Sequence, residues 1–159
     1  MKKLPLLISL FAFAISLGTA RAEHLGKKLE AAGLAGIIGT WVDEGSGGEE
    51  VTLTYTWRVE NHALSITVKA PDGETEALIG VDPASGEIKH VAFNSRGGFS
   101  LGQWVNQDDV PTLKVKTTNS DGDSRDIEVT HKIVDGKLMV GMKNPETDEG
   151  GELTMVRKK

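Results

Sequence analysis

Alternation of apolar and polar residues with a period of two runs through most of the chain and constrains its fold more than any other feature. The clearest stretch is residues 51–59, where apolar side chains alternate with threonines and an arginine. Successive side chains of a β-strand point to opposite faces, so this pattern is typical of a strand with one buried face. Similar runs follow, and the sequence predicts strands at about 39–44, 50–59, 62–70, 75–82, 87–94, 98–105, 111–118, 125–134, 137–143 and 151–157.

Turn-forming residues separate these runs at short, regular intervals. Asp135-Gly136 is the strongest hairpin signal, because both residues tolerate a positive φ. No connection between the runs is long enough for a parallel crossover, so consecutive strands are expected to pair as antiparallel hairpins. An open meander would leave two sheet edges unpaired, and closure removes them. The sequence therefore predicts an all-β fold, an antiparallel up-and-down barrel of about 8–10 strands.

One short helix is expected before the first strand. Between residues 24 and 35 the apolar side chains of Leu25, Leu29 and Ala32 fall near helical spacing, and Gly33 and Gly36 mark the end of the pattern. We expect this helix to close one end of the barrel.

The first 22 residues have the composition of a signal peptide rather than of the fold. Two lysines precede an uncharged apolar run over residues 4–17, and Ala20-Arg21-Ala22 places small residues where signal peptidase cleaves. The apolar run is short for a membrane span, and an uncleaved anchor helix is the alternative to a cleaved signal peptide. We expect a signal peptide at 1–22, a single β-barrel domain at 23–159, and a periplasmic or secreted bacterial protein with no membrane span after cleavage.

Charge and cysteine content exclude several classes of function. The leader contains three of the 18 Lys and Arg residues and none of the 23 acidic ones, so its removal takes the net charge from −5 to −8. A nucleic-acid-binding domain would carry a basic surface instead. The chain has no cysteine, which excludes disulfides, cysteine-ligated zinc and a thiol nucleophile. We expect a monomer or a weak dimer.

The triplet Gly39-Thr40-Trp41, directly after the predicted helix, resembles the Gly-x-Trp signature of the lipocalins and the wider calycin barrels. The resemblance implies that Trp41 lies inside the closed base of a barrel. It also implies that an arginine on the last strand packs across the indole ring, and Arg157 occupies the matching place. The second lipocalin signature, Thr-Asp-Tyr, is absent.

A wider likeness covers most of the domain. Residues 39–45, Asp82-Pro83, residues 93–99 and Gly102-Gln103-Trp104 resemble an uncharacterised bacterial exported lipocalin-like domain. This resemblance implies a fold and a compartment but supplies no activity.

His131 is the most informative single residue. It alternates in step with Ile127, Val129 and Ile133 and therefore lies on the same face of the predicted strand. Its side chain is expected to point into the barrel. A buried histidine either hydrogen-bonds to a neighbour in the core or serves as a ligand, for example to haem. Haem-binding barrels of the nitrobindin type carry Gly-x-Trp-x-Gly-x-Gly, and Asp43 replaces one of those glycines here. No cofactor is predicted, with haem kept as the disfavoured alternative.

No motif for catalysis or metal binding stands out. The four histidines are scattered singly, and no serine lies in a nucleophile elbow. We therefore expect no catalytic residue and no metal site, and a small enzyme remains only as a third alternative. The expected function is binding of a small apolar molecule, and the alternative is a structural or protein-interaction barrel of the cell envelope with a filled interior. The residues expected to line a ligand site are Tyr55, Trp57, Val129, His131 and Met142.

Overall fold

The computed structural model describes residues 23–159, which form a barrel of ten strands with two short helical segments before it. The predicted signal peptide lies outside the described residues. The helical segments are α1 (Leu25–Ala31) and the single 3₁₀ turn η1 (Ala35–Ile37). The strands are β1 (Gly39–Asp43), β2 (Thr52–Val59), β3 (Ala63–Ala70), β4 (Gly73–Val81), β5 (Ile88–Asn94), β6 (Phe99–Gln107), β7 (Val110–Thr118), β8 (Ser124–Val134), β9 (Lys137–Lys143) and β10 (Gly150–Arg157).

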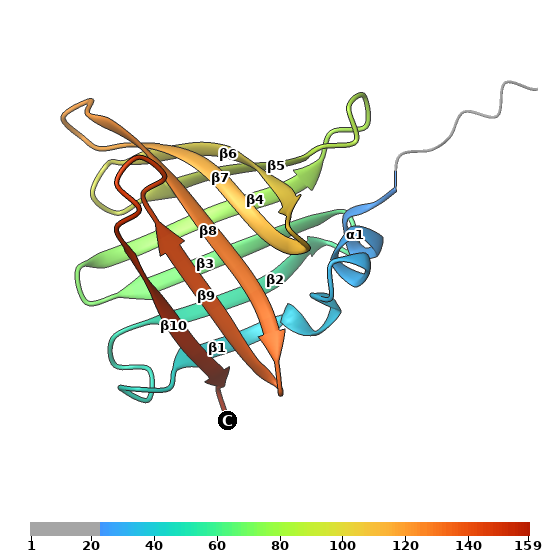
Figure 1. The fold of residues 1–159 in the computed structure, drawn as a ribbon, viewed down its shortest axis with the longest axis horizontal. Helices are drawn as coiled ribbons and strands as arrows, with labels where there is room; N and C mark the ends of the chain where they lie inside the picture. The colour runs from blue at the N-terminus through green and yellow to red at the C-terminus, as the bar shows by residue number, and fades with distance from the viewer. Residues whose placement is uncertain (1–22) are drawn as a thin grey trace, which may run out of the picture.

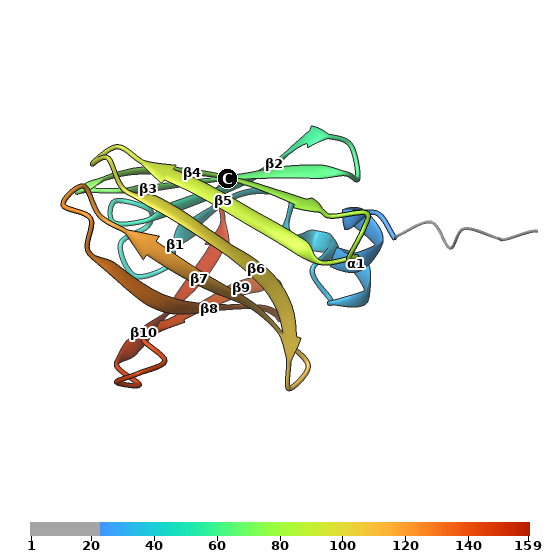
Figure 2. The same ribbon diagram turned by 90° about the horizontal axis from the view of Figure 1, so that it is seen from above.

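Each strand pairs antiparallel with its neighbour along the chain, and β1 pairs with β10 to close the barrel. Figures 1 and 2 show this meander as a continuous wall from blue to red. The predicted fold is confirmed: an all-β, antiparallel up-and-down barrel with a short helix at its N-terminal end. The predicted strand boundaries agree with the observed ones to within about two residues, because the hairpin turns end the strands where the turn residues lie.

The period-two pattern corresponds to the two faces of the barrel wall. In β2 the side chains of Leu53 and Tyr55 are buried, whereas those of Thr56 and Arg58 are exposed. Inward-facing residues of β1–β5, β9 and β10 form one apolar core with residues before β1. The fully buried large side chains of this core are Leu25, Ile37, Trp41, Tyr55, Leu64, Leu138 and Met155.

The helix is shorter than the predicted span of 24–35. Gly33 adopts φ +71°, a left-handed conformation that ends a helix, and the backbone N–H of Leu34 donates to the carbonyl of Leu29 at 2.8 Å. At the other end of α1, Nδ1 of the His24 imidazole accepts a hydrogen bond from the backbone N–H of Lys27 at 3.3 Å. The chain then continues through η1 into β1.

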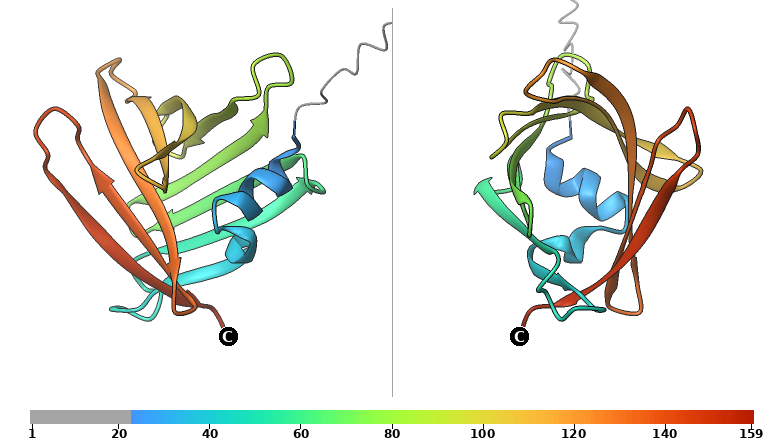
Figure 3. Two further views of the ribbon diagram at one scale, coloured as in Figure 1. Left: turned by 45° about the vertical axis from the view of Figure 1, so that its right-hand side comes forward. Right: turned by 90° about the vertical axis from the view of Figure 1, so that its left-hand side faces the viewer.

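Both helical segments lie across one mouth of the barrel. Figure 3 shows α1 and η1 within the opening when the molecule is viewed along the barrel. Leu25 and Ile37 are buried against inward-facing strand residues, and the N–H of Gly26 donates to the carbonyl of Asn61 in the β2–β3 turn at 3.0 Å. The segment before β1 therefore covers this mouth by apolar packing and is also bonded to its rim.

Among residues 23–159, no helix has the length and apolar character needed to cross a membrane.

Candidate ligand-binding cavity

The two ends of the barrel wall meet at Trp41 and Arg157. These residues are opposite each other in the β1–β10 pairing, and the Arg157 guanidinium carbon lies 4.1 Å from the centroid of the Trp41 ring. The guanidinium also donates to the carbonyl oxygens of Ile38, at 2.5 Å, and of Gly36. The Trp41 indole N–H donates to the Ile37 carbonyl at 2.7 Å. The expected packing of Arg157 on Trp41 is confirmed, and it ties η1 to the closure of the barrel.

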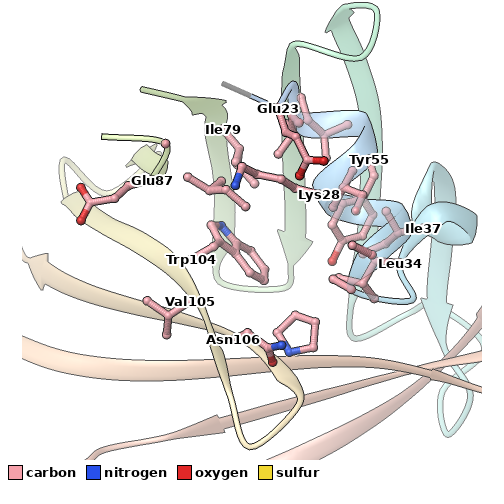
Figure 4. A pocket seen from close by; sticks show the side chains of 18 of the residues that line it. Glu23, Lys28, Leu34, Ile37, Tyr55, Ile79, Glu87, Trp104, Val105 and Asn106 are labelled. Carbon is pink, nitrogen blue, oxygen red and sulfur yellow. The ribbon is translucent and has the colours of Figure 1, made fainter. Parts of the chain in front are cut away.

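A cavity of about 320 Å³ lies between α1 and the barrel wall on the side of β2–β7. Figure 4 shows its lining side chains, with α1 on one side and Trp104, Val105 and Asn106 of β6 on the other. Its volume falls at the lower end of the range for small-molecule pockets, roughly 300–1,000 Å³. The apolar side chains that line it include Leu25, Leu29, Leu34, Ile37, Leu64, Ile66, Ile79 and Ile88.

A cluster of polar and aromatic side chains stands beside this cavity. The Tyr55 hydroxyl and Nε2 of His131 share a hydrogen bond of 2.9 Å, and both residues are buried. The indole of Trp104 lies edge-on to the His131 imidazole, with 4.8 Å between ring centroids. Tyr55 and Trp104 line the cavity, and His131 lies behind them. The histidine therefore positions the two aromatic rings that face the open space.

Burial makes both interior histidines weak bases. It lowers the pKa of His131 to about 4, with a smaller contribution from the nearby His90, and it lowers the pKa of His90 to about 4. Both imidazoles are consequently neutral at pH 7. Burial also raises the pKa of the Tyr55 hydroxyl, which stays protonated. The cluster offers neutral hydrogen-bonding groups and no charge.

The five residues predicted to line a ligand site are distributed along the barrel rather than gathered in one place. Tyr55 lines the cavity, and His131 contacts it through Tyr55 and Trp104. Trp57 is partly buried against the core, and Val129 is half-buried in β8. Met142 is 52% exposed and borders a shallow depression beside the β9–β10 turn. The structure thus brings Tyr55 and His131 together beside the cavity, and it pairs Val129 with Met142 outside the cavity lining.

Several residues that line the cavity were not predicted to do so. Ile88 lies on the inward face of β5 and Trp104 on the inward face of β6, whereas Lys28 lies on α1. The signal that could have identified Trp104 and Ile88 is their pairing, because residues directly opposite in adjacent strands share a face. Lys28 carries no such signal, since its position depends on how α1 sits in the mouth.

Asp43, which stands where the nitrobindin-type pattern has glycine, fastens the loop between β1 and β2. Its carboxylate accepts hydrogen bonds from the hydroxyl and backbone N–H of Ser46, at 2.5 and 2.7 Å, and from the N–H of Val51 at 2.9 Å. These bonds, led by that of the Ser46 hydroxyl, lower the pKa of Asp43 to about 2. The carboxylate at this position therefore holds the β1–β2 loop in place through hydrogen bonds.

Within the part of the chain that the structure describes, no group of three or more His, Asp or Glu side chains is placed to hold a metal ion. Comparisons with protein families, with curated proteins and with solved structures find no match to this chain.

Proposed function

We propose that this chain is an exported, non-catalytic, calycin-type barrel of bacterial origin that binds a small apolar molecule between α1 and the barrel wall. The observation that carries the proposal is the cavity of about 320 Å³ with its largely apolar lining. Apolar surface left in contact with water is unfavourable by about 25 cal/mol per Å², so an apolar guest that displaces this water gains free energy. The signal-peptide pattern of residues 1–22 supports the exported location.

A titration of the mature chain with 1-octanol, followed by amide NMR spectra, tests this proposal. We expect shifts at Leu29, Tyr55 and Trp104, which line the cavity. Ala32 also lines it, so Ala32→Phe should fill the space and abolish the shifts. Ala84→Phe is the matched control, because Ala84 is exposed and is not among the residues that line the cavity. Unchanged spectra with 1-octanol, or equal binding by Ala32→Phe, would contradict the proposal.

A second candidate function, protein interaction, is favoured by an apolar stripe on the outer wall. Leu78 of β4, Val91 of β5 and Leu101 of β6 are directly opposite one another in register, and Phe93 is opposite Phe99. Phe93 is 63% exposed and Leu101 is 56% exposed. The rings of Phe93 and Phe99 lie 5.2 Å apart, and these residues are two positions from Val91 and Leu101 on the same faces of β5 and β6. Contiguous exposed apolar side chains on a protein surface favour a role in interaction with a partner.

The occupant we propose for this stripe is a second copy of the chain. Five side chains provide much less than the roughly 800 Å² per partner of a stable interface, so the expected product is a weak dimer. Sedimentation over a range of concentrations should show self-association that is lost in Phe93→Ser/Leu101→Ser. The control Val59→Ser/Val134→Ser removes two exposed apolar side chains outside the stripe and should still associate. A monomer at all concentrations would exclude this function.

A further inference from the structure

Lys28 places a cation in the wall of an otherwise largely apolar cavity. It is half-buried on α1 and lines the cavity, and Figure 4 shows its side chain extending across the open space toward Ile79 and Trp104. The ion pairs among residues 23–159 all use other basic residues. An ammonium group has three hydrogen-bond donors and no acceptor, so this group requires an anionic or polar partner.

Trp104 provides a second donor without a partner in the same cavity. Its indole Nε1 is shielded from solvent and has no hydrogen-bond partner among the described residues. In Figure 4 this nitrogen lies on the ring edge that faces Ile79 and the end of the Lys28 side chain. Indole N–H is a donor only, and a buried donor is normally satisfied. The two unpaired donors therefore lie on the same side of the cavity.

The acceptors that line the cavity are hydrogen-bonded already or belong to exposed residues. The Glu87 carboxylate forms an ion pair with Lys89 at 2.5 Å, and the Tyr55 hydroxyl bonds with His131. Glu23 is exposed. The rest of the lining consists mainly of aliphatic side chains. The cavity thus combines a mainly apolar interior with the donors of Lys28 and Trp104 on one side, the first of them charged.

We infer that the cavity takes an amphiphile with a single apolar chain and a carboxylate head, whose oxygens accept hydrogen bonds from the Lys28 ammonium and the Trp104 indole N–H. The inference rests on the proposed binding function and specifies the ligand class for the same cavity. A carboxylate supplies two acceptor oxygens, and a charge-assisted hydrogen bond is about twice as strong as a neutral one. The chain of the amphiphile would occupy the aliphatic part of the cavity.

The test compares octanoate with 1-octanol, which have chains of equal length and different heads. Calorimetry should show that Lys28→Met weakens octanoate binding about fivefold, the effect of a partly exposed ion pair, and changes 1-octanol binding less than twofold. Lys27→Met is the matched control, because Lys27 is the neighbouring lysine on α1, is exposed and does not line the cavity. It removes the same charge and should leave the binding of both molecules unchanged.

A second measurement addresses the indole. Octanoate should shift the Trp104 indole proton resonance downfield more than 1-octanol does, and Trp104→Phe should weaken octanoate binding more than 1-octanol binding. If 1-octanol binds but Lys28→Met leaves octanoate affinity unchanged, or Lys27→Met lowers it equally, the carboxylate inference is overturned and the apolar binding function stands. If neither molecule binds, both are overturned.

Discussion

The Arg157 guanidinium lies over the Trp41 indole at 4.1 Å, which joins the last strand of the barrel to the first. The same group donates to the carbonyl oxygens of Gly36 and Ile38, so one side chain holds β10, β1 and the segment that carries η1. Because closure removes the two edges of the sheet, this contact stabilises the whole barrel.

Removal of this guanidinium should weaken the closure. We expect Arg157→Leu to lower the free energy of unfolding by about 1–2 kcal/mol, from the loss of the cation–π contact and two hydrogen bonds at a partly exposed site. Urea denaturation measures the change. Arg157→Lys should recover part of the loss, because it keeps the charge but not the planar fork. Lys158→Leu removes an adjacent exposed charge, and an equal loss in that variant would contradict the prediction.

Gly39 provides the space that Arg157 needs. Its φ is +120°, and a Cβ at this position would overlap Nη1 of Arg157. We expect Gly39→Ala to destabilise the fold by about 2 kcal/mol or more, through backbone strain and displacement of the guanidinium. Gly151→Ala in β10 is the control, since a Cβ there meets no atom within 4 Å. Equal thermal stability of the two variants would show that the close approach at Gly39 is not required.

Stability should depend on pH through the two interior histidines. The pKa values of His90 and His131 are lowered from 6.5 to about 4 in the folded chain, so the unfolded chain binds more protons between these values. The free energy of unfolding should therefore fall as the pH is lowered from 6.5 to 4, by up to about 2.7 kcal/mol per pH unit for two protons.

Urea denaturation at a series of pH values measures this slope. The double variant His90→Gln/His131→Gln should flatten it over the same window. His62→Gln, which replaces an exposed histidine, should follow the original curve. Parallel curves for the original chain and the double variant would assign the slope to other groups.

Processing of the leader is expected to expose Glu23 as the new N-terminus. Expression of the full chain in a bacterium with a general secretory pathway, followed by N-terminal sequencing, measures the cleavage position. Ala20→Arg should block cleavage, because the third residue before the cut must be small, whereas Gly18→Ala should permit it. Export without cleavage, or cleavage elsewhere, would contradict the predicted boundary at residue 22.

The strands could be predicted because two local signals agree. Alternation marks each strand, and residues such as Asp135-Gly136 mark its end; Asp135 and Gly136 both adopt positive φ in the structure. The helix could be predicted only approximately. Its apolar spacing continues past Gly33, where the backbone leaves the helix.

The cavity could be predicted only in part. The alternation of apolar and polar residues shows which face of the strand a residue is on, but not how far along the barrel axis it lies. Leu138 and Met142 share a face of β9, yet Leu138 is fully buried and Met142 is 52% exposed. The difference arises because α1 and η1 cover only the end of the barrel near Leu138. Which strand residues face α1 depends on the packing of the whole domain, and this is why Lys28 and Trp104 could not be assigned to the cavity from local patterns.

A crystal structure of the mature chain grown with 1-octanol tests the central claim most directly. The account predicts electron density for the alcohol between α1 and Trp104, in contact with Ile66 and Ile79, with the barrel otherwise unchanged. An empty cavity, or one filled by inward movement of α1 side chains, would contradict it.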